Sequence, residues 1–198
     1  RSDGTGFPAP GGIRASSRGA SALPLTQPHP TPAESRPLQG KRMNIHLISV
    51  GNKMPSWVSD GYLEYAKRLP AECTLKLTEI APGRRGQRVD VARTLRDEGE
   101  RMLKSVPKGC RLLALDVGGR QWSSEQLAVQ LNDWMAQGSD VALLVGGPDG
   151  LAPECLASSD MTWSLSALTY PHALVRIILA EQLYRAWSIN AGHPYHRS

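Results

Sequence analysis

Long apolar runs are missing from this sequence of 198 residues. No segment reaches the roughly 18 uninterrupted apolar residues of a membrane-spanning helix, so we expect no membrane partner. Four familiar motifs are also missing: the GxGxxG turn, the lysine-bearing phosphate loop, the GxSxG elbow and the HExxH helix. The sequence therefore gives no motif-based support for a dinucleotide enzyme, a P-loop nucleotidase, a serine hydrolase or a zinc peptidase.

Cysteine is scarce, with only Cys73, Cys110 and Cys155 in the chain. They lack CxxC spacing, and no histidine lies close to them along the sequence to complete a metal site. We therefore expect the three cysteines to be small, buried, apolar residues of a protein from a reducing compartment, and we expect no bound metal.

The basic charge is concentrated at the N-terminus. The net charge is +5, but residues 1–42 hold six basic and two acidic residues, which leaves a net charge near +1 for residues 43–198. Residues 1–42 also carry 7 of the 15 prolines and show no apolar periodicity, so we expect a disordered extension. We interpret it as a tag or upstream read-through ahead of Met43; a transit peptide is the alternative.

From Met43 onward, strand-like and helix-like segments alternate. Strands are expected at 44–50, 73–80, 111–116 and 141–145 and just before Ser166. A first helix is expected at 56–69, and a second follows the basic loop at 81–88 and ends at about 106. A third begins at the Ser123–Gln126 capping box and ends at Gly138, and a fourth follows Pro171. Trp57 and Val91 are assigned to inward helix faces, and Gly118-Gly119 is assigned to a chain turn. This alternation predicts an α/β fold, a mainly parallel sheet with helices on both faces.

Ligands of such sheets bind beyond the carboxyl ends of the strands. The segments expected there are Asp116 to Gly119, Gly146 to Gly150 and Ser166 to His172, so we expect them to build the ligand site. On spacing alone, the glycine-rich segment after the strand at 141–145 fits ordinary turn chemistry better than a cofactor loop.

The end of the chain is crowded with reactive side chains. The segment His193-Pro194-Tyr195-His196-Arg197 packs two imidazoles, a phenol and a guanidinium into five residues. This composition favours a functional tail. Taken alone, His172 and Arg185 fit either function or structure, as a hydrogen-bonded histidine at a helix start and a salt-bridge partner.

Several long motifs follow one another along the chain: Gly51-Asn52-Lys53-Met54-Pro55, Val145-Gly146-Gly147-Pro148-Asp149-Gly150-Leu151, Trp163-Ser164-Leu165-Ser166-Ala167-Leu168-Thr169, Pro171-His172, Leu183-Tyr184-Arg185-Ala186-Trp187-Ser188-Ile189 and the His193–Arg197 tail. Together they resemble the RlmH (YbeA) family of the SPOUT class of methyltransferases. The resemblance covers essentially all of residues 43–198, which we expect to form one domain.

The resemblance implies a C-terminal trefoil knot, which no sequence pattern could predict. It implies a cytoplasmic homodimer that transfers a methyl group from S-adenosylmethionine to N3 of a pseudouridine in 23S ribosomal RNA on the assembled 70S ribosome. Carried over by position, the cofactor contacts are Leu115, Gly147, Ser166, Ala167, Leu168, Thr169, Tyr170 and Pro171. Tyr170 replaces the leucine that is more frequent in the family.

For catalysis, the resemblance and the chemistry together favour His172, Arg185, Tyr195 and His196. Methyl transfer to a weakly acidic ring N–H benefits from a base or a nearby cation, so the two histidines are candidate bases. For RNA binding we select Arg84, Arg85, Arg88 and Arg197, with Lys53 nearby; a solvated basic loop is the alternative.

Two other functions stay open at this point. A knotted methyltransferase of transfer RNA would differ in its RNA substrate. A non-catalytic ribosome-binding or assembly factor would not bind S-adenosylmethionine.

Overall fold

A computed structural model describes residues 42–84, 86 and 90–197 of the chain. The predicted extension therefore lies outside the described residues, apart from Arg42. The predicted RNA contacts Arg85 and Arg88 and the side chain of Arg197 lie outside them as well.

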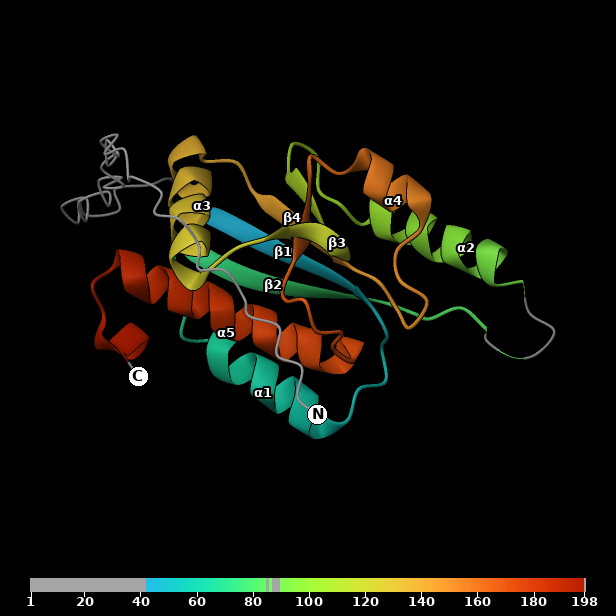
Figure 1. Cartoon of the computed structure of the whole chain (residues 1–198), viewed down its shortest axis with the longest axis horizontal. Helices are drawn as coiled ribbons and strands as arrows, with labels where there is room; N and C mark the ends of the chain where they lie inside the picture. The colour runs from blue at the N-terminus through green and yellow to red at the C-terminus, as the bar shows by residue number, and fades with distance from the viewer. Residues whose placement is uncertain (1–41, 85, 87–89, 198) are drawn as a thin grey trace, which may run out of the picture. The chain divides into compact units, whose positions relative to one another are not determined.

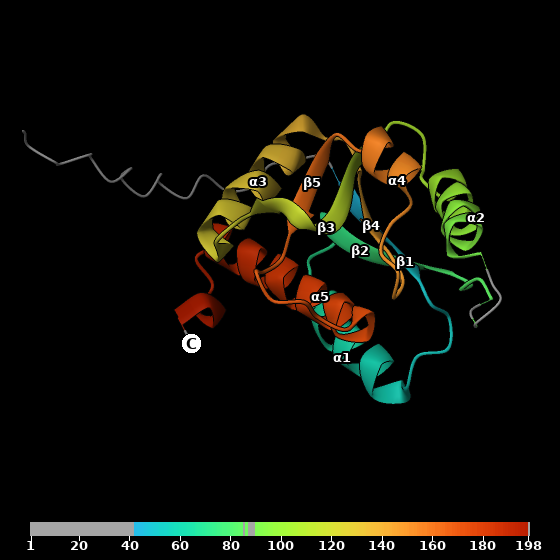
Figure 2. The same ribbon diagram turned by 45° about the vertical axis from the view of Figure 1, so that its right-hand side comes forward.

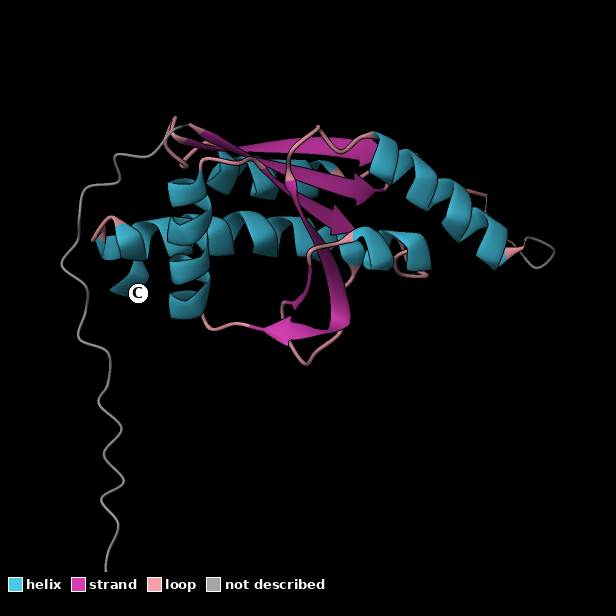
Figure 3. Cartoon of the chain, turned by 90° about the horizontal axis from the view of Figure 1, so that it is seen from above, coloured by secondary structure: helices cyan, strands magenta, loops and turns pink. Residues whose placement is uncertain are grey.

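Five strands form one twisted sheet (Figure 3). Their order is β2-β1-β4-β3-β5, and every neighbouring pair is parallel. This confirms the predicted parallel α/β sheet. The strands are β1 (Met43–Val50), β2 (Cys73–Ile80), β3 (Arg111–Gln121), β4 (Val141–Val145) and β5 (Met161–Ser164).

Helices cover both faces of the sheet (Figures 1 and 2). On one face α5 packs between α1 and α3, and α2 packs with α4 on the other. The helices are α1 (Ser56–Ala66), α2 (Val91–Lys104), α3 (Ser124–Gln137), α4 (Pro153–Ser158) and α5 (His172–Asn190), followed by the short 3-10 helix η1 (Pro194–Arg197).

The strand alternation supplies two separate cores. Leu113 and Leu143 face α1, α3 and α5, whereas their neighbours Leu112 and Leu144 face α2 and α4. Successive side chains of a strand point to opposite faces, so a continuous apolar strand such as β4 fills both cores. All five residues of β4 are buried.

The predicted ends of α3 are confirmed. Ser123 forms the full capping box with Gln126, and Gly138 ends the helix in the left-handed conformation with φ 68°. Helix α1 is shorter than the predicted range 56–69: it ends at Ala66, and Lys67 is its C-cap.

Three predictions of local structure are wrong. Gly118 and Gly119 do not turn the chain: they stay in β3, where the pairing with β5 shifts register between Leu115 and Arg120. A Cβ on Gly119 would lie 2.7 Å from the backbone of Trp163, so glycine there permits close strand approach rather than a turn. Trp57 and Val91 are not inward, being 53% and 50% exposed at the starts of their helices.

Cys73 and Cys155 are buried, as expected for small apolar residues. Among the described residues, no helix combines the length and the apolar character needed to cross a membrane.

Candidate functional site

The carboxyl ends of β3, β4 and β5 open into one cavity of about 580 Å³. This size lies within the roughly 300–1,000 Å³ of small-molecule sites. Its walls come from residues 115–117, from residues 146–148 with Gly150, and from the segment that leaves β5 and enters α5. The three segments predicted to build a ligand site therefore do surround a single pocket.

The wall after β4 is a tight glycine turn. The N–H of Gly150 donates to the carbonyl of Gly147 over 3.0 Å, and Gly150 has φ 86°. A Cβ on Gly146 would lie 2.2 Å from the carbonyl oxygen of Gly150. A larger residue at 146 would force the backbone apart, so Gly146 is needed for the turn itself.

The wall after β5 takes its shape from two serines. The buried Ser164 hydroxyl donates to the carbonyl of Ser166 over 3.0 Å, and the Ser166 hydroxyl accepts from the N–H of Leu168 over 3.0 Å. These bonds shape the exposed loop at 167–169, of which Leu168 and Thr169 line the cavity. Backbone groups of this loop are thereby held in place for a ligand.

All predicted cofactor positions except Ala167 line the cavity. Trp163 was not selected from the sequence, although it also lines the cavity and is only 2% exposed. Among the described residues its indole N–H has no hydrogen-bond partner. Asp116 lines the cavity too, and its carboxylate accepts from the N–H of Gly118 over 2.9 Å.

His172 is the first residue of α5 and lines the same cavity. One turn later, Arg176 is buried and fixes this end of the helix. Its guanidinium pairs with Glu79 over 2.6 Å and donates to the Ser49 hydroxyl and to the carbonyls of Val50 and Gly51. Arg176 thus ties α5 to the carboxyl ends of β1 and β2, beside His172.

The other predicted catalytic residues gather around Glu181. The Glu181 carboxylate accepts from the Arg185 guanidinium over 2.7 Å and from the Tyr195 hydroxyl over 3.0 Å. The Arg185 guanidinium lies 5.0 Å from the centre of the Tyr195 ring. Burial raises the pKa of Tyr195, and its hydrogen bonds with Tyr65 and Glu181 raise it further. The ion pair with Glu181 raises the pKa of Arg185.

Tyr184 and Trp187 close this group on its apolar side. The Tyr184 ring lies 4.8 Å from that of Tyr195 and stacks on that of Trp187 at 5.8 Å. In η1, Nδ1 of His196 lies 2.6 Å from the carbonyl of His193. We call residues Glu181, Tyr184, Arg185, Trp187, His193, Tyr195 and His196 the C-terminal cluster.

His172, which lines the cavity, begins α5, whereas the C-terminal cluster starts at Glu181 and continues through the end of the helix into η1. Figure 1 shows η1 beyond the far end of α5. His172 and Arg185 are separated by about 20 Å along the axis, at 1.5 Å per residue. Within one chain, the structure brings His172 to the predicted cofactor residues but does not bring Arg185, Tyr195 or His196 to them. The sequence had suggested one catalytic group.

Of the predicted RNA contacts, only Arg84 has a described side chain, which is exposed. Its carbonyl accepts from the Thr94 hydroxyl over 3.4 Å. All four stay predictions.

The cavity suits a cofactor with both apolar and polar parts. Trp163, Val145 and Val175 supply apolar surface, and the loop at 166–171 supplies backbone groups. The indole N–H of Trp163 is a buried donor that a bound group could satisfy. The tight turn at Gly146 places backbone, without a side chain, at this part of the cavity wall.

The comparisons with known proteins cover nearly all of the described chain. Residues 43–196 match the family model described as "Predicted SPOUT methyltransferase". The chain is 58% identical over 155 residues to ribosomal RNA large subunit methyltransferase H of Thioalkalivibrio sulfidiphilus (strain HL-EbGR7), covering 78% of this chain and 99% of that protein.

Solved structures overlap only partially. A methylase family protein from Haemophilus influenzae Rd KW20 has TM-score 0.47 at 12% identity, covering 78% of this chain and 70% of that one. An AdoMet-bound rRNA methyltransferase from Sinorhizobium meliloti has TM-score 0.40 at 11% identity, covering 75% and 57%.

Proposed function

Because this chain belongs to the SPOUT methyltransferases, and within them to the RlmH family, we propose that it methylates N3 of a pseudouridine in 23S ribosomal RNA. The chain is a methyltransferase with S-adenosylmethionine as cofactor. The proposal concerns its target: the large-subunit RNA, reached on the assembled 70S ribosome in the cytoplasm. The 58% identical relative, covered over 99% of its length, is named ribosomal RNA large subunit methyltransferase H, which supports large-subunit RNA as the substrate.

The cavity at the carboxyl edge is the proposed cofactor site. When bound, the sulfonium of S-adenosylmethionine supplies an electrophilic methyl group. The loop at 166–171 would hold the adenosine portion through its backbone, with Trp163 and Leu115 as apolar walls. Asp116 follows Leu115 and also lines the cavity, where its carboxylate would stabilise the positive charge of the sulfonium. We also propose the family's trefoil knot for the segment that enters α5.

His172 is the proposed proton acceptor. It faces the cavity, where an acceptor base would also have to lie, and the ring N–H of a uracil-type base must lose its proton as the new bond forms. Holding the two reactants in line can contribute up to about 7–11 kcal/mol, so the rigid placement of His172 matters as much as its basicity. Arg176 provides that rigidity through its four bonds to β1, β2 and the residues that follow β1.

The C-terminal cluster is the proposed partner of this site in a homodimer. Arg185 and Tyr195 are about 20 Å from His172 in their own chain, too far to share one nucleotide with it. In a two-fold dimer each surface contacts the equivalent surface of the other copy, so two antiparallel α5 helices would place the cluster of one protomer at the cavity of its partner. There Arg185 and Tyr195 would hold the phosphate or the ring carbonyls of the target nucleotide.

The test is transfer of tritiated methyl from S-adenosylmethionine to three substrates prepared from a strain that lacks this enzyme. They are 70S ribosomes, isolated subunits and bulk transfer RNA. Label confined to the large-subunit RNA of 70S particles, mapped to N3 of one pseudouridine by mass spectrometry of nuclease fragments, is the expected result.

The other outcomes identify the alternatives. Label in free transfer RNA would indicate a transfer RNA methyltransferase. Cofactor binding without label on any RNA would overturn the ribosomal target. No cofactor binding would favour an assembly factor.

A further inference from the structure

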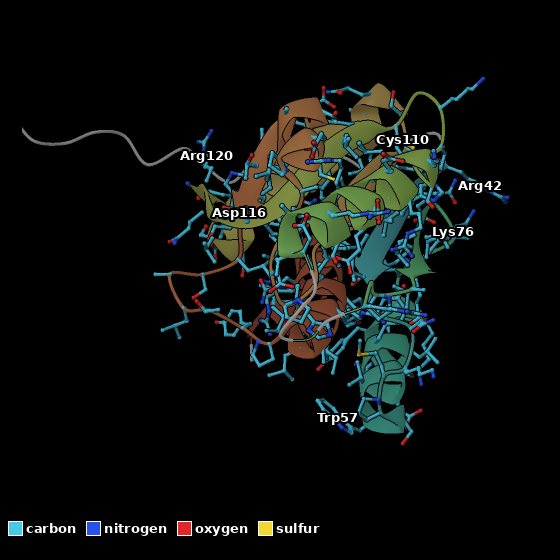
Figure 4. The ribbon with its side chains drawn as sticks, turned by 90° about the vertical axis from the view of Figure 1, so that its right-hand side faces the viewer. Arg42, Trp57, Lys76, Cys110, Asp116 and Arg120 are labelled. Atoms are coloured by element: carbon cyan, nitrogen blue, oxygen red, sulfur yellow. The ribbon has the colours of Figure 1, made fainter. Side chains whose placement is uncertain are left out.

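A histidine of β1 meets a cysteine and an aspartate that immediately precede β3 and β4, at the amino edge of the sheet opposite the cofactor cavity. They are His46, Cys110 and Asp140, and one ligand atom from each lies within 4.8 Å of the others. Figure 4 shows Cys110 on the side away from Asp116, which lies at the cavity end of β3. The proposed methyltransferase mechanism uses none of the three.

The strand register explains why they meet. Ile45 and Arg111 are both partners of Val141, so the preceding residues Asn44, Cys110 and Asp140 lie side by side across three strands. His46 follows Asn44 by two residues and therefore projects from the same face of β1. The chain separations of 64 and 30 residues hid the group from an inspection of sequence spacing, which found no histidine near the cysteines.

We propose that His46, Cys110 and Asp140 bind a divalent transition-metal ion, with zinc as the best match. Imidazole, thiolate and carboxylate are the three ligand types that zinc takes in proteins. Ligand atoms around tetrahedral zinc lie about 3.3–3.7 Å apart, given bonds of about 2.0–2.3 Å. Nε2 of His46 and Oδ2 of Asp140 are 3.2 Å apart, close to this spacing. All three ligand atoms lie within 4.8 Å of one another, so shifts of about 1 Å would bring them to tetrahedral spacing.

The surroundings support this ligand set. Asn44 donates to Oδ1 of Asp140 from its backbone over 2.8 Å and to Oδ2 from its side chain over 3.0 Å. Such bonds orient a metal-binding carboxylate. All three ligand residues are half-buried, so an ion can enter, and one thiolate plus one carboxylate would balance its charge. A simple His46–Asp140 ion pair accounts for two of the residues and leaves Cys110 without a role.

The probe is cobalt(II), added under reducing, oxygen-free conditions to the full chain after chelator treatment. A cobalt–thiolate charge-transfer band in the near ultraviolet should appear with a stoichiometry of one and disappear when zinc is added. Cys110→Ser should abolish the band, whereas the matched control Cys155→Ser should retain it. Asp140→Asn and His46→Gln should each weaken cobalt binding at least about tenfold.

Two results would overturn the proposal: no band at saturating cobalt, or a band that survives Cys110→Ser. The wild-type protein gives an independent test if a variant fails to fold. Zinc should slow iodoacetamide modification of Cys110 at least about tenfold, and an unchanged rate would count against the site. Zinc at about 100 times its Kd should also raise Tm by about 5–10 °C.

Discussion

The two ends of α5 differ in how their polar groups are satisfied. At the start of the helix, His172 faces a cavity of about 580 Å³, and the adjoining loop is exposed. At the far end, the guanidinium of Arg185 and the hydroxyl of Tyr195 are both bound by Glu181 within the chain. The first end adjoins an open cavity, whereas at the second end the polar groups of Arg185 and Tyr195 are already bonded within the chain.

Arg176 anchors the first turns of α5, at the cavity, to β1 and β2. Its side chain is 2% exposed and its partner Glu79 is 38% exposed, so the pair lies at the boundary between core and surface. Removing one member of a buried pair leaves the other uncompensated. The cavity end therefore depends on one buried cation, while the cluster end depends on several aromatic and ionic contacts of moderate strength.

The largest expected effect is loss of the cavity itself. Gly146→Val should abolish cofactor binding and methyl transfer, because its Cβ would lie 2.2 Å from the carbonyl oxygen of Gly150. Equilibrium dialysis with labelled S-adenosylmethionine measures the binding. Ala136→Val is the control, since Ala136 is exposed on α3 and does not line the cavity. Normal binding by Gly146→Val would contradict the assigned site.

His172→Ala should separate chemistry from binding. We expect methyl transfer to fall about 10²–10⁴-fold, as for loss of a general base, with cofactor affinity within about threefold of the wild type. Single-turnover transfer to ribosomes gives the rate. Leu174→Ala, on the same turn of α5 but outside the cavity lining, should retain activity. A rate for His172→Ala within threefold of the wild type would remove His172 from the mechanism.

Arg176→Met should act mainly on stability. We expect the free energy of unfolding to fall by about 3 kcal/mol and Tm by about 10 °C. Lys104→Met removes an exposed pair with Glu100 at 3.6 Å and should cost less than about 1 kcal/mol. Equal losses in the two variants would mean that Arg176 does not anchor the helix.

The smallest effect concerns pH. Burial and the hydrogen bonds with Tyr65 and Glu181 raise the pKa of Tyr195, so folding favours its neutral form. The resulting stability is complete below the ordinary pKa of about 10 and is lost as the pH rises above it. Thermal melts between pH 8 and 11 should show a shallower alkaline decline for Tyr195→Phe than for the control Tyr170→Phe. Identical declines would exclude Tyr195 as the source.

Regular parts of the fold could be predicted because their signals are local. The capping box at Ser123, the left-handed Gly138 and the apolar run of β4 each fix a structure through neighbouring residues. The turn predicted at Gly118-Gly119 is wrong because glycines also occur where two strands approach closely. Here the nearby backbone of Trp163 shows that the second role applies.

The cavity was predictable from topology, because parallel strands place their following loops at one edge. The separation of His172 from Arg185 also follows from the helix predicted after Pro171, since 13 helical residues span about 20 Å. The roles of Arg176 and Glu181 could not be predicted, because their partners Glu79 and Tyr195 lie on β2 and in the tail. The sequence alone shows two ordinary charged residues in a helix.

The most direct test of this account mixes two inactive variants. His172→Ala disables the cavity end, and a second chain carrying Arg185→Ala with Tyr195→Phe disables the C-terminal cluster. If the two ends join across a two-fold interface, each mixed dimer contains one site with both ends intact. Co-expressed chains should then recover about one quarter of the wild-type methyl transfer, because half of the dimers are mixed and each has one working site. Mixed dimers, verified by mass, that are no more active than either variant alone would contradict it.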